Sequence, residues 1–460
     1  MIWISFAVMV GTIVGSLALL RSDRGDALGI PLIAIGTFAF LYVIQPLALI
    51  LTGSSGIFLT DVQFSKGVLI PALMLAFFMW GWLHPGRQKQ QAVAPWDPRA
   101  MWWTGFWAAS VGLILYLIFL ERSGGITASF SQAHGGAMAY NQNTAYIYDG
   151  PWLMLSGSAM MMFGDPKSKS HRWRSLAPYI FLALYFLSAI LTGSRGPLFA
   201  VATTYFVGSS IALRKRVSFG QAARMLLPVG IAVLLIVGYR SVLHLGEESS
   251  ADSAQVDLPS AETALENAAS PSEYDKEHDT AAQEFLFHAA TIEAVDQSGR
   301  LEFGLSWIQF FFINPIPRVL WPDKQNPVWT GVNWEDINEY TGIAISPGAA
   351  PGIVADLYAR FHLFSAIFFF ALGAGLRWLF MAARNLSSPV TAVGYVMAYA
   401  VSLNMFAQGF GATFVPFGYS MAPVIAFAWF TRHSRRKAQL HQSEMNLRRA
   451  AALHSEQWSS

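Results

Sequence analysis

Long apolar runs separated by short polar segments set the pattern of this 460-residue chain. Many of the runs reach the ~20 residues that an α-helix needs to cross ~30 Å of hydrocarbon. Because unpaired backbone groups cannot face lipid, such runs must be helical. The pattern therefore predicts an all-α polytopic integral membrane protein with about eleven transmembrane helices. The predicted spans lie near residues 2–20, 29–51, 67–83, 101–120, 147–163, 176–192, 197–213, 226–239, 363–383, 389–407 and 415–430.

The composition agrees with a membrane protein and excludes several kinds of site. Hydrophobic residues make up 54% of the chain and charged residues only 13%, whereas soluble domains carry about 25% charged residues. The chain has no cysteine, which excludes disulfides, Cys-ligated metals and a thiol nucleophile. The first residues lack a basic segment and a small-residue cleavage site, so we expect a retained first span. The basic residues are scattered and form no stripe, so nothing indicates nucleic-acid binding.

The distribution of Lys and Arg predicts the orientation in the membrane. If the N-terminus lies outside, the cytoplasmic segments hold 21 of the 30 basic residues. Because Lys and Arg concentrate in cytoplasmic loops, we predict a periplasmic N-terminus and a cytoplasmic C-terminus in a bacterial inner membrane. The predicted cytoplasmic segments are 21–28, 84–100, 164–175, 214–225, 377–388 and 432–460.

The chain divides into four parts. Residues 1–239 form an N-terminal bundle of about eight spans, 363–431 the C-terminal spans, and 432–460 a basic cytoplasmic tail. Residues 240–362 form one large periplasmic loop region with membrane-adjacent helices, and 19 of the 28 acidic residues lie within 240–361. In this loop the pattern predicts a polar flap over 246–279, an amphipathic helix over 284–297 and a proline-broken aromatic segment at the outer leaflet.

Cations on the predicted outer face are candidate ligands for a phosphate group. Arg195 occupies a glycine-flanked turn between two spans, where backbone can approach a ligand closely. Asp356 and Arg360 are four residues apart, which puts both on one helix face. Each cation also has a plainer interpretation as an interface anchor, a solvated charge or a surface ion pair. The candidates are Arg195, Arg240, Arg318, Lys324 and Arg360.

Candidates for a catalytic base lie in the same loop region. His288 shares a helix face with Glu284, and its neutral imidazole is available near pH 7. Glu293 and Asp356 are the other candidates, and a packing role for His288 stays open. The outer loops contain no metal-binding motif, so we expect neither a metal nor a cofactor.

Together the topology and these short motifs resemble Wzy-type polymerases of oligosaccharide repeat units, the O-antigen and exopolysaccharide polymerases, which are related to the O-antigen ligases. The resemblance in topology covers nearly the whole chain, whereas the motifs cover a small part of it. The long acidic flap departs from the family pattern. The motifs are Gly193-Ser194-Arg195-Gly196, Ile316-Pro317-Arg318 with Trp321-Pro322-Asp323-Lys324, and Ser346-Pro347-Gly348 leading into Asp356-Leu357-Tyr358-Ala359-Arg360.

The resemblance implies a function in polysaccharide biosynthesis. A glycan on polyprenyl diphosphate would be the donor, and a base would remove the proton of the acceptor hydroxyl while arginines hold the departing diphosphate. Tyr358 and Trp321 would then contact the glycan, and a chain-length regulator is a possible partner. A ligase acting on a lipid A core acceptor and a transporter or flippase of lipid-linked glycans remain alternatives. Transporters favour ionisable residues near mid-membrane and repeated halves, and neither is evident in this sequence.

Overall fold

The computed structural model confirms the predicted all-helical fold in the described residues and is consistent with a helical membrane protein. Every regular element among the described residues is a helix. Seven of these helices are long and apolar enough to cross a membrane. The described residues are 1–22, 29–51, 59–84, 96–122, 147, 149–164, 172–191, 195–215, 217, 282–300, 303–305, 316, 321, 334–343, 350–411 and 413–433.

The helices follow most of the predicted spans, with two differences. The predicted span 147–163 is a shorter helix, α10 (Trp152–Gly164). The predicted span 363–383 is α20 (Ser365–Arg384), which is preceded by a separate helix, α19 (Gly352–Phe361). The predicted span 226–239 lies outside the described residues. The seven long helices are Ile2–Arg21, Ile30–Leu51, Asp61–Leu83, Pro98–Arg122, Gly352–Arg384, Pro389–Gln408 and Thr413–His433, and the shorter apolar ones are Trp152–Gly164, Trp173–Leu187 and Gly196–Ala212.

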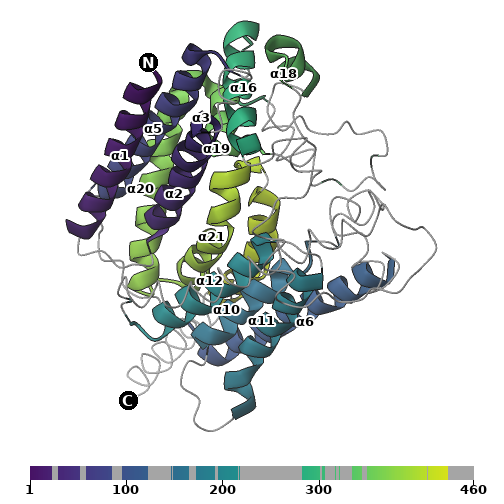
Figure 1. Cartoon of the computed structure of the whole chain (residues 1–460). Coiled ribbons are helices and arrows are strands. Elements are labelled where there is room, and N and C mark those ends of the chain that lie inside the picture. Colours follow the sequence, from purple (N-terminus) through teal and green to yellow (C-terminus); the bar gives the residue numbers. More distant parts are fainter. Residues whose placement is uncertain are drawn as a thin grey trace, which may run out of the picture.

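Two groups of helices lie on either side of α21, as Figure 1 shows. On one side, α21 packs against α2 and α20, and on the other against α10 and α12. In the first group α5 contacts α1 and α20, and in the second α10 contacts α6 and α11. The bounds are α1 Ile2–Ser22, α2 Ile30–Ala39, the π-helix η1 Phe40–Ile44, α3 Gln45–Leu51, α5 Asp61–Leu83, α6 Pro98–Arg122, α11 Arg172–Leu191, α12 Arg195–Ala212 and α21 Pro389–Gln408.

Glycines let α5 and α20 pack with their backbones in close contact. A Cβ atom added at Gly81 would lie 2.8 Å from the carbonyl carbon of Phe370, and one added at Gly373 would lie 2.9 Å from the backbone nitrogen of Trp82. Small residues at such positions are typical of helix pairs in membranes. Earlier along both helices, the Ser365 hydroxyl donates to the sulfur of Met74 at 3.4 Å. The two helices are therefore parallel and begin at the same end of the bundle.

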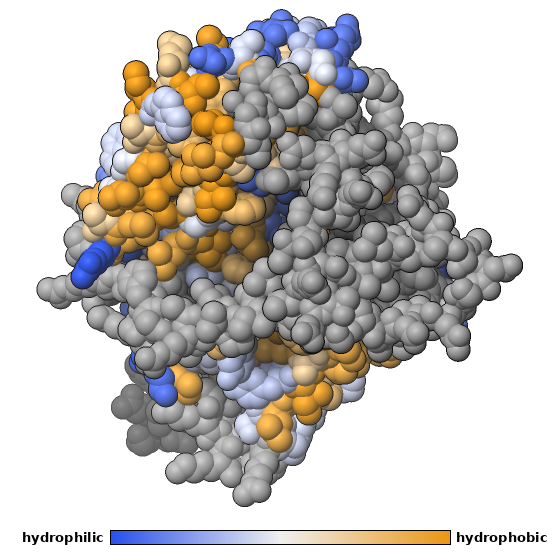
Figure 2. Space-filling model, viewed as in Figure 1, coloured by the Kyte–Doolittle hydropathy of each residue, from blue (hydrophilic) through white to orange (hydrophobic). Residues whose placement is uncertain are grey.

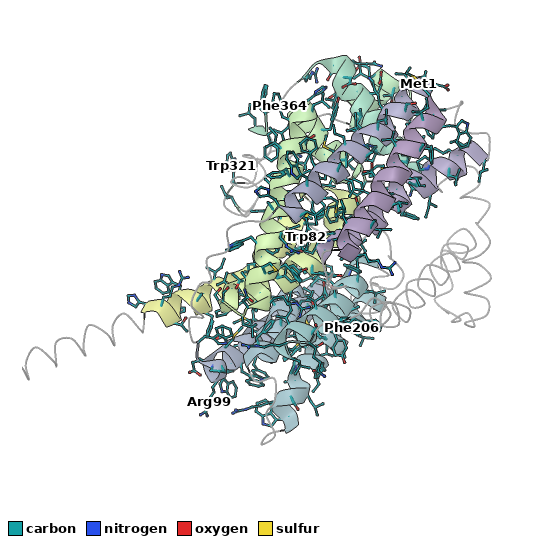
Figure 3. The ribbon with its side chains drawn as sticks, turned by 90° about the vertical axis from the view of Figure 1, so that its left-hand side faces the viewer. Met1, Trp82, Arg99, Phe206, Trp321 and Phe364 are labelled. Atoms are coloured by element: carbon teal, nitrogen blue, oxygen red, sulfur yellow. The ribbon has the colours of Figure 1, made fainter. Side chains whose placement is uncertain are left out.

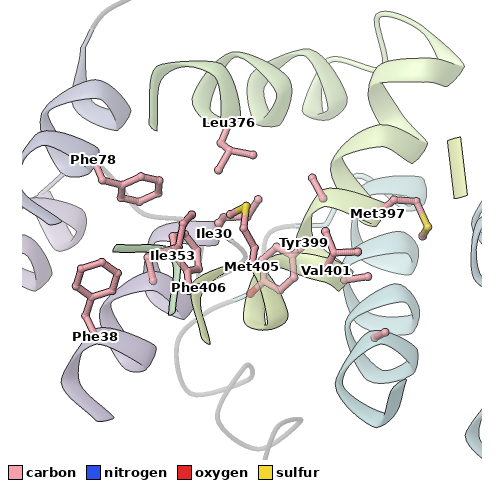
Figure 4. Packing of buried hydrophobic residues seen from close by; sticks show 14 of the residues in the cluster. Ile30, Phe38, Phe78, Ile353, Leu376, Met397, Tyr399, Val401, Met405 and Phe406 are labelled. Carbon is pink, nitrogen blue, oxygen red and sulfur yellow. The ribbon is translucent and has the colours of Figure 1, made fainter. Parts of the chain in front are cut away.

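Aromatic side chains fill the junction between α21 and the first group (Figure 4). The ring of Phe406 on α21 lies edge-to-face with Phe38 and Phe78, at centroid distances of 6.2 and 5.6 Å. Such geometry adds about 0.5–1.5 kcal/mol to the gain from burial. Ile353, the second residue of α19, is buried in the same cluster. The core thus reaches the end of the bundle at which α19 begins.

Polar residues gather at that end of the bundle. In Figure 2 hydrophobic residues cover the side where Figure 1 shows α1 and α2, and hydrophilic residues lie at the top, near α16 (Gln283–Ser298) and α18 (Trp334–Thr341). Figure 3 shows Met1 and Phe364 at this end and Arg99 at the opposite end. We refer to it below as the α16 end.

Candidate functional site

Helix α16 is buried at the α16 end of the bundle. The sequence correctly predicts a helix here, and the structure buries more of it than the predicted amphipathic pattern over 284–297 suggests. Residues 285–292, 294 and 295 are all buried, because α5, α18 and α19 pack around the helix. Its polar residues therefore face other helices, where they meet side chains from distant parts of the sequence.

Five side chains from three segments form a hydrogen-bonded group, which we call the Asp296 cluster. Lys66 of α5 donates to Asp296 Oδ2 at 2.6 Å, and its Nζ lies 3.4 Å from Glu293 Oε2. The Tyr358 hydroxyl donates to Asp296 Oδ1 at 2.8 Å. His362 Nε2 lies 2.8 Å from the Tyr358 oxygen and 3.2 Å from Asp296 Oδ1. One carboxylate thus joins α16 to both α5 and α19.

The surroundings of Asp296 keep its carboxyl group ionised. Burial alone would raise its pKa, but hydrogen bonds from Lys66 and Tyr358 and the charge of Lys66 hold the pKa of Asp296 below its ordinary value. The side chains of Lys66 and His362 are each 37% exposed. The cluster is therefore a charged site that a ligand can reach from the surface.

His362 has an unusual backbone conformation. It stands between α19 and α20 in the 3₁₀ turn His362–Phe364, with φ 51° and ψ −138°. L-residues rarely adopt such a conformation, and it costs on the order of 1–3 kcal/mol. Strain of this kind occurs most often at functional sites. The contacts of His362 in the Asp296 cluster hold the side chain in place despite this cost.

The contacts of His362 also decide which ring nitrogen can accept a proton. Both groups near Nε2, the Asp296 carboxylate and the Tyr358 oxygen, can accept a hydrogen bond. We therefore assign the ring hydrogen to Nε2, which leaves the lone pair on Nδ1. An imidazole oriented by a carboxylate in this way can act as a general base.

Asp356 and Arg360 form a buried ion pair on another face of α19. Arg360 Nε donates to Asp356 Oδ1 at 2.9 Å, and both side chains are nearly inaccessible. The backbone N–H of Phe410 donates to Asp356 Oδ2 at 2.8 Å. The predicted sharing of one helix face is thus observed. Through the contact between Asp356 and Phe410, the pair links α19 to the segment that directly follows α21.

His288 is buried inside the junction between α16, η1 and the start of α19. Its Nδ1 lies 3.3 Å from the carbonyl oxygen of Pro351, and its ring centroid lies 4.7 Å from that of Tyr42. Glu284, which shares a helix face with His288, accepts a hydrogen bond from Gln45 at 2.7 Å. Burial lowers the pKa of His288 to about 3, although the carbonyls of Pro351 and Gly67 oppose the shift. His288 is therefore neutral at physiological pH.

The burial of His288 predicts a loss of stability in mild acid. Its pKa is about 3 in the folded protein, against about 6.5 in an unfolded chain. The contribution of the neutral His288 ring to the free energy of unfolding is fully present above pH 6.5. Below pH 6.5 this contribution falls by about 1.4 kcal/mol per pH unit, because only the unfolded state takes up the proton. We expect the purified protein to lose more of its thermal midpoint between pH 7 and pH 5 than His288→Gln, which cannot titrate at this position. Equal losses in the two proteins would show that His288 is already protonated or accessible when folded.

The other candidate residues are placed less completely. Arg195 begins α12 at the α16 end of α21, since a Cβ added at its neighbour Gly196 would lie 2.9 Å from the side-chain nitrogen of Asn404. Trp321 is exposed. Arg240, Arg318 and Lys324 lie outside the described residues. The structure thus joins Glu293 with Tyr358 through Lys66 and Asp296, and Asp356 with Arg360.

Three residues of the Asp296 cluster are absent from the candidates that the sequence suggests: Lys66, Asp296 and His362. A signal for two of them exists in the helix spacing. Asp296 follows Glu293 by three residues and His362 follows Tyr358 by four, so each shares a helix face with a residue that the sequence does single out. Lys66 gives no such signal, because its partners lie more than two hundred residues away.

Comparisons with known proteins identify no relative of this chain. No family model, no curated protein and no solved structure matches it. Its function must therefore be inferred from the residues themselves.

Proposed function

We propose that this chain polymerises oligosaccharide repeat units carried on polyprenyl diphosphate, by glycosyl transfer at the α16 end of the bundle. In this proposal the chain has about eleven spans, and the α16 end faces the periplasm. The observation that carries the proposal is the Asp296 cluster. It provides a carboxylate-oriented, partly exposed histidine at the α16 end of the bundle, where the proposal puts the lipid-linked substrate.

The cluster supplies the proton transfer that the reaction needs. The acceptor hydroxyl gives its proton to Nδ1 of His362, and its oxygen attacks the anomeric carbon of the donor glycan. The bond from that carbon to the diphosphate oxygen breaks, and polyprenyl diphosphate leaves with the electron pair. Asp296 stabilises the imidazolium that forms, and a base in this role contributes about 10²–10⁴-fold to the rate. His362 fits the role better than buried His288 because its side chain is partly exposed.

The diphosphate needs cations from outside the Asp296 cluster. Among the described residues at the α16 end, the carboxylates Glu284, Glu293, Asp296, Asp336 and Asp356 outnumber the cations Lys66, Arg300 and Arg360. Such a site favours hydroxyl groups over anions. The arginine that begins α12, Arg195, lies at the same end of α21 and is our first candidate to hold the departing diphosphate, since Arg binds phosphate oxygens bidentately. Arg240, Arg318 and Lys324 are the others.

Deletion of the gene, followed by electrophoresis of the surface polysaccharide, tests the proposed function. A polymerase is supported if the deletion strain carries single repeat units in place of long chains. If long chains persist on the free carrier and are absent only from the lipid core, the chain is a ligase. If no repeat unit reaches the periplasm, it is a transporter. Complementation with Asp296→Asn separates loss of the protein from loss of this site.

The proposed orientation makes a separate prediction. Reporter fusions after Lys89, Arg216 and Lys437 are expected to report cytoplasm, and a fusion near Ser250 periplasm, because basic residues concentrate in cytoplasmic loops. Paired alkaline phosphatase and fluorescent-protein fusions give the two signals. A cytoplasmic signal at Ser250 would place the Asp296 cluster on the wrong face for the proposed reaction.

A further inference from the structure

An open groove lies between α6 and the last described helix, Thr413–His433. It encloses about 980 Å³, which is at the upper end of the range for small-molecule sites. Each helix contributes one face, because lining residues recur at a spacing of four. They include Ala100, Thr104 and Ala108 on α6, and Ala422, Ala426 and Phe430 on the last described helix.

The surroundings of the groove are apolar. Both helices are long and apolar enough to cross a membrane. Trp107 of α6 and Phe430 also line the groove, and both rings are largely exposed. Apolar surface of this kind is more stable against hydrocarbon than against water. Most of the groove therefore fits a hydrocarbon chain.

One end of the groove is polar, and it lies opposite the α16 end of the bundle. Asp97 and Thr431 belong to the lining there, and Figure 3 shows Arg99 at this end. Helix α21 also starts here, since α20 begins at the α16 end and leads into it. The last described helix runs back along α21 to the same end, because a Cβ added at Gly394 would lie 3.5 Å from Met421 Cε.

Two arginines adjoin this polar end of the lining. Arg99 follows Asp97 by two residues, and Arg432 follows Thr431 directly. Both arginines are exposed, and neither belongs to an ion pair among the described residues. The carboxylate of Asp97 caps α6, since its Oδ1 accepts from the backbone N–H of Arg99 at 2.9 Å. The groove thus ends beside two cations, which are suited to a phosphate group.

A phospholipid fits this groove better than a helix of another chain. Helices in membranes pack where small residues let their backbones come close. Small residues do line the groove, but the exposed rings of Trp107 and Phe430 stand among them on both helices. Hydrocarbon chains are flexible enough to pass around such rings, whereas a helix backbone is held away by them. The arginines add charge complementarity to the headgroup.

We propose that the groove binds one anionic phospholipid, with its hydrocarbon chains between α6 and the last described helix and its phosphate at Arg99 and Arg432. In the proposed orientation this end faces the cytoplasm, where anionic lipids attract basic segments. The bound lipid fills the space between two spans and so stabilises the position of the last described helix. This proposal does not depend on the proposed function.

Stabilisation of the purified, delipidated protein by added phospholipid tests the proposal. A ligand that binds only the folded protein raises the thermal midpoint as its concentration increases. We expect a larger rise with phosphatidylglycerol, which is anionic, than with phosphatidylcholine, which has no net charge. Arg99→Gln/Arg432→Gln should weaken phosphatidylglycerol binding roughly 25-fold, about five-fold for each arginine, and leave phosphatidylcholine binding unchanged.

Arg300→Gln is the matched control, because it removes an exposed arginine at the α16 end. Its response to both lipids should equal that of the wild-type protein. Equal stabilisation of the wild-type protein by the two lipids overturns the proposal. An unchanged response of the double arginine variant to phosphatidylglycerol does so as well.

A second variant fills the groove and leaves the arginines in place. Ala426 is exposed and lines the groove, so Ala426→Trp adds a ring there without displacing a buried side chain. We expect both lipids to lose their effect on the thermal midpoint. A wild-type response of this variant to phosphatidylglycerol overturns the proposal. If the variant folds poorly, the arginine variant still decides.

Light scattering of the same proteins distinguishes the other occupant. If Ala426→Trp turns a dimer into a monomer, a helix of a second copy occupies the groove and the proposal is wrong. We expect the oligomeric state to stay the same. These experiments use protein without glycan or prenyl substrate, so failure of the proposed function leaves their meaning unchanged.

Discussion

Replacing His362 by alanine is expected to slow polymerisation by about 10²–10⁴-fold, the usual contribution of a positioned general base. Asp296→Asn is expected to act in the same direction, because the neutral amide lacks the negative charge that stabilises the imidazolium. The assay is elongation by purified enzyme supplied with lipid-linked repeat units. Both variants should still insert and accumulate, since Tyr358 keeps an acceptor at position 296 and Lys66 keeps Glu293 at 3.4 Å.

Asp336→Asn is the matched control for Asp296→Asn. Asp336 also lies at the α16 end and pairs with an arginine, Arg300, at 3.4 Å, but that arginine is 61% exposed. Its loss should leave elongation unchanged, since exposed pairs contribute about 0–1 kcal/mol. Wild-type elongation by both His362→Ala and Asp296→Asn would mean that the cluster only holds α16 on the bundle. His288 and Glu293 would then be the remaining base candidates in α16.

Replacing Arg360 by methionine is expected to destabilise the protein by about 3–5 kcal/mol, the cost of leaving one member of a buried ion pair alone. Methionine has nearly the length of arginine without its charge, so the buried carboxylate of Asp356 would keep the Phe410 N–H but lose its counter-ion. The expected result is poor accumulation in the membrane and a lower thermal midpoint. The double variant Asp356→Asn/Arg360→Met should recover most of the loss, because the buried carboxylate at position 356 is removed together with the charge of Arg360.

This experiment also separates two roles for Arg360. If the residue serves mainly to hold the diphosphate, Arg360→Met will accumulate normally, keep its thermal midpoint and lose only activity. Arg300→Met is the control, because it removes an arginine from an exposed pair on the same end. We expect it to change the stability by less than about 1 kcal/mol.

The sequence predicts the helices better than the site. Apolar length alone locates most spans, since the membrane constrains every one of them in the same way. The helical spacing also gives the Asp356–Arg360 pair correctly. Long-range contacts leave no such periodic signal. Lys66 meets Asp296 across 230 positions of sequence, and Gln45 takes the place near Glu284 that the spacing suggested for His288.

The sequence also predicts the surroundings of α16 poorly. Its polar residues suggest a helix with one solvent-exposed face. In the structure, α5, α18 and α19 pack around the helix. Polar residues on such a helix find partners in other helices in place of water. The pattern of apolar positions therefore locates the helix but does not show which helices pack against it. Those neighbouring helices determine the protonation states of His288 and Asp296.

The turn at His362 divides an apolar run that is too long for one crossing. Gly352–Arg384 is a run of 33 residues, which as one straight helix would measure about 50 Å against ~30 Å of hydrocarbon. The break leaves α20 with 20 residues, or about 30 Å, which is about the thickness of the hydrocarbon. The ten residues of α19 pack instead against α16 and α21. The strained residue thus separates α20, which is long enough to cross a membrane, from α19, and it carries the histidine that joins this break to the Asp296 cluster.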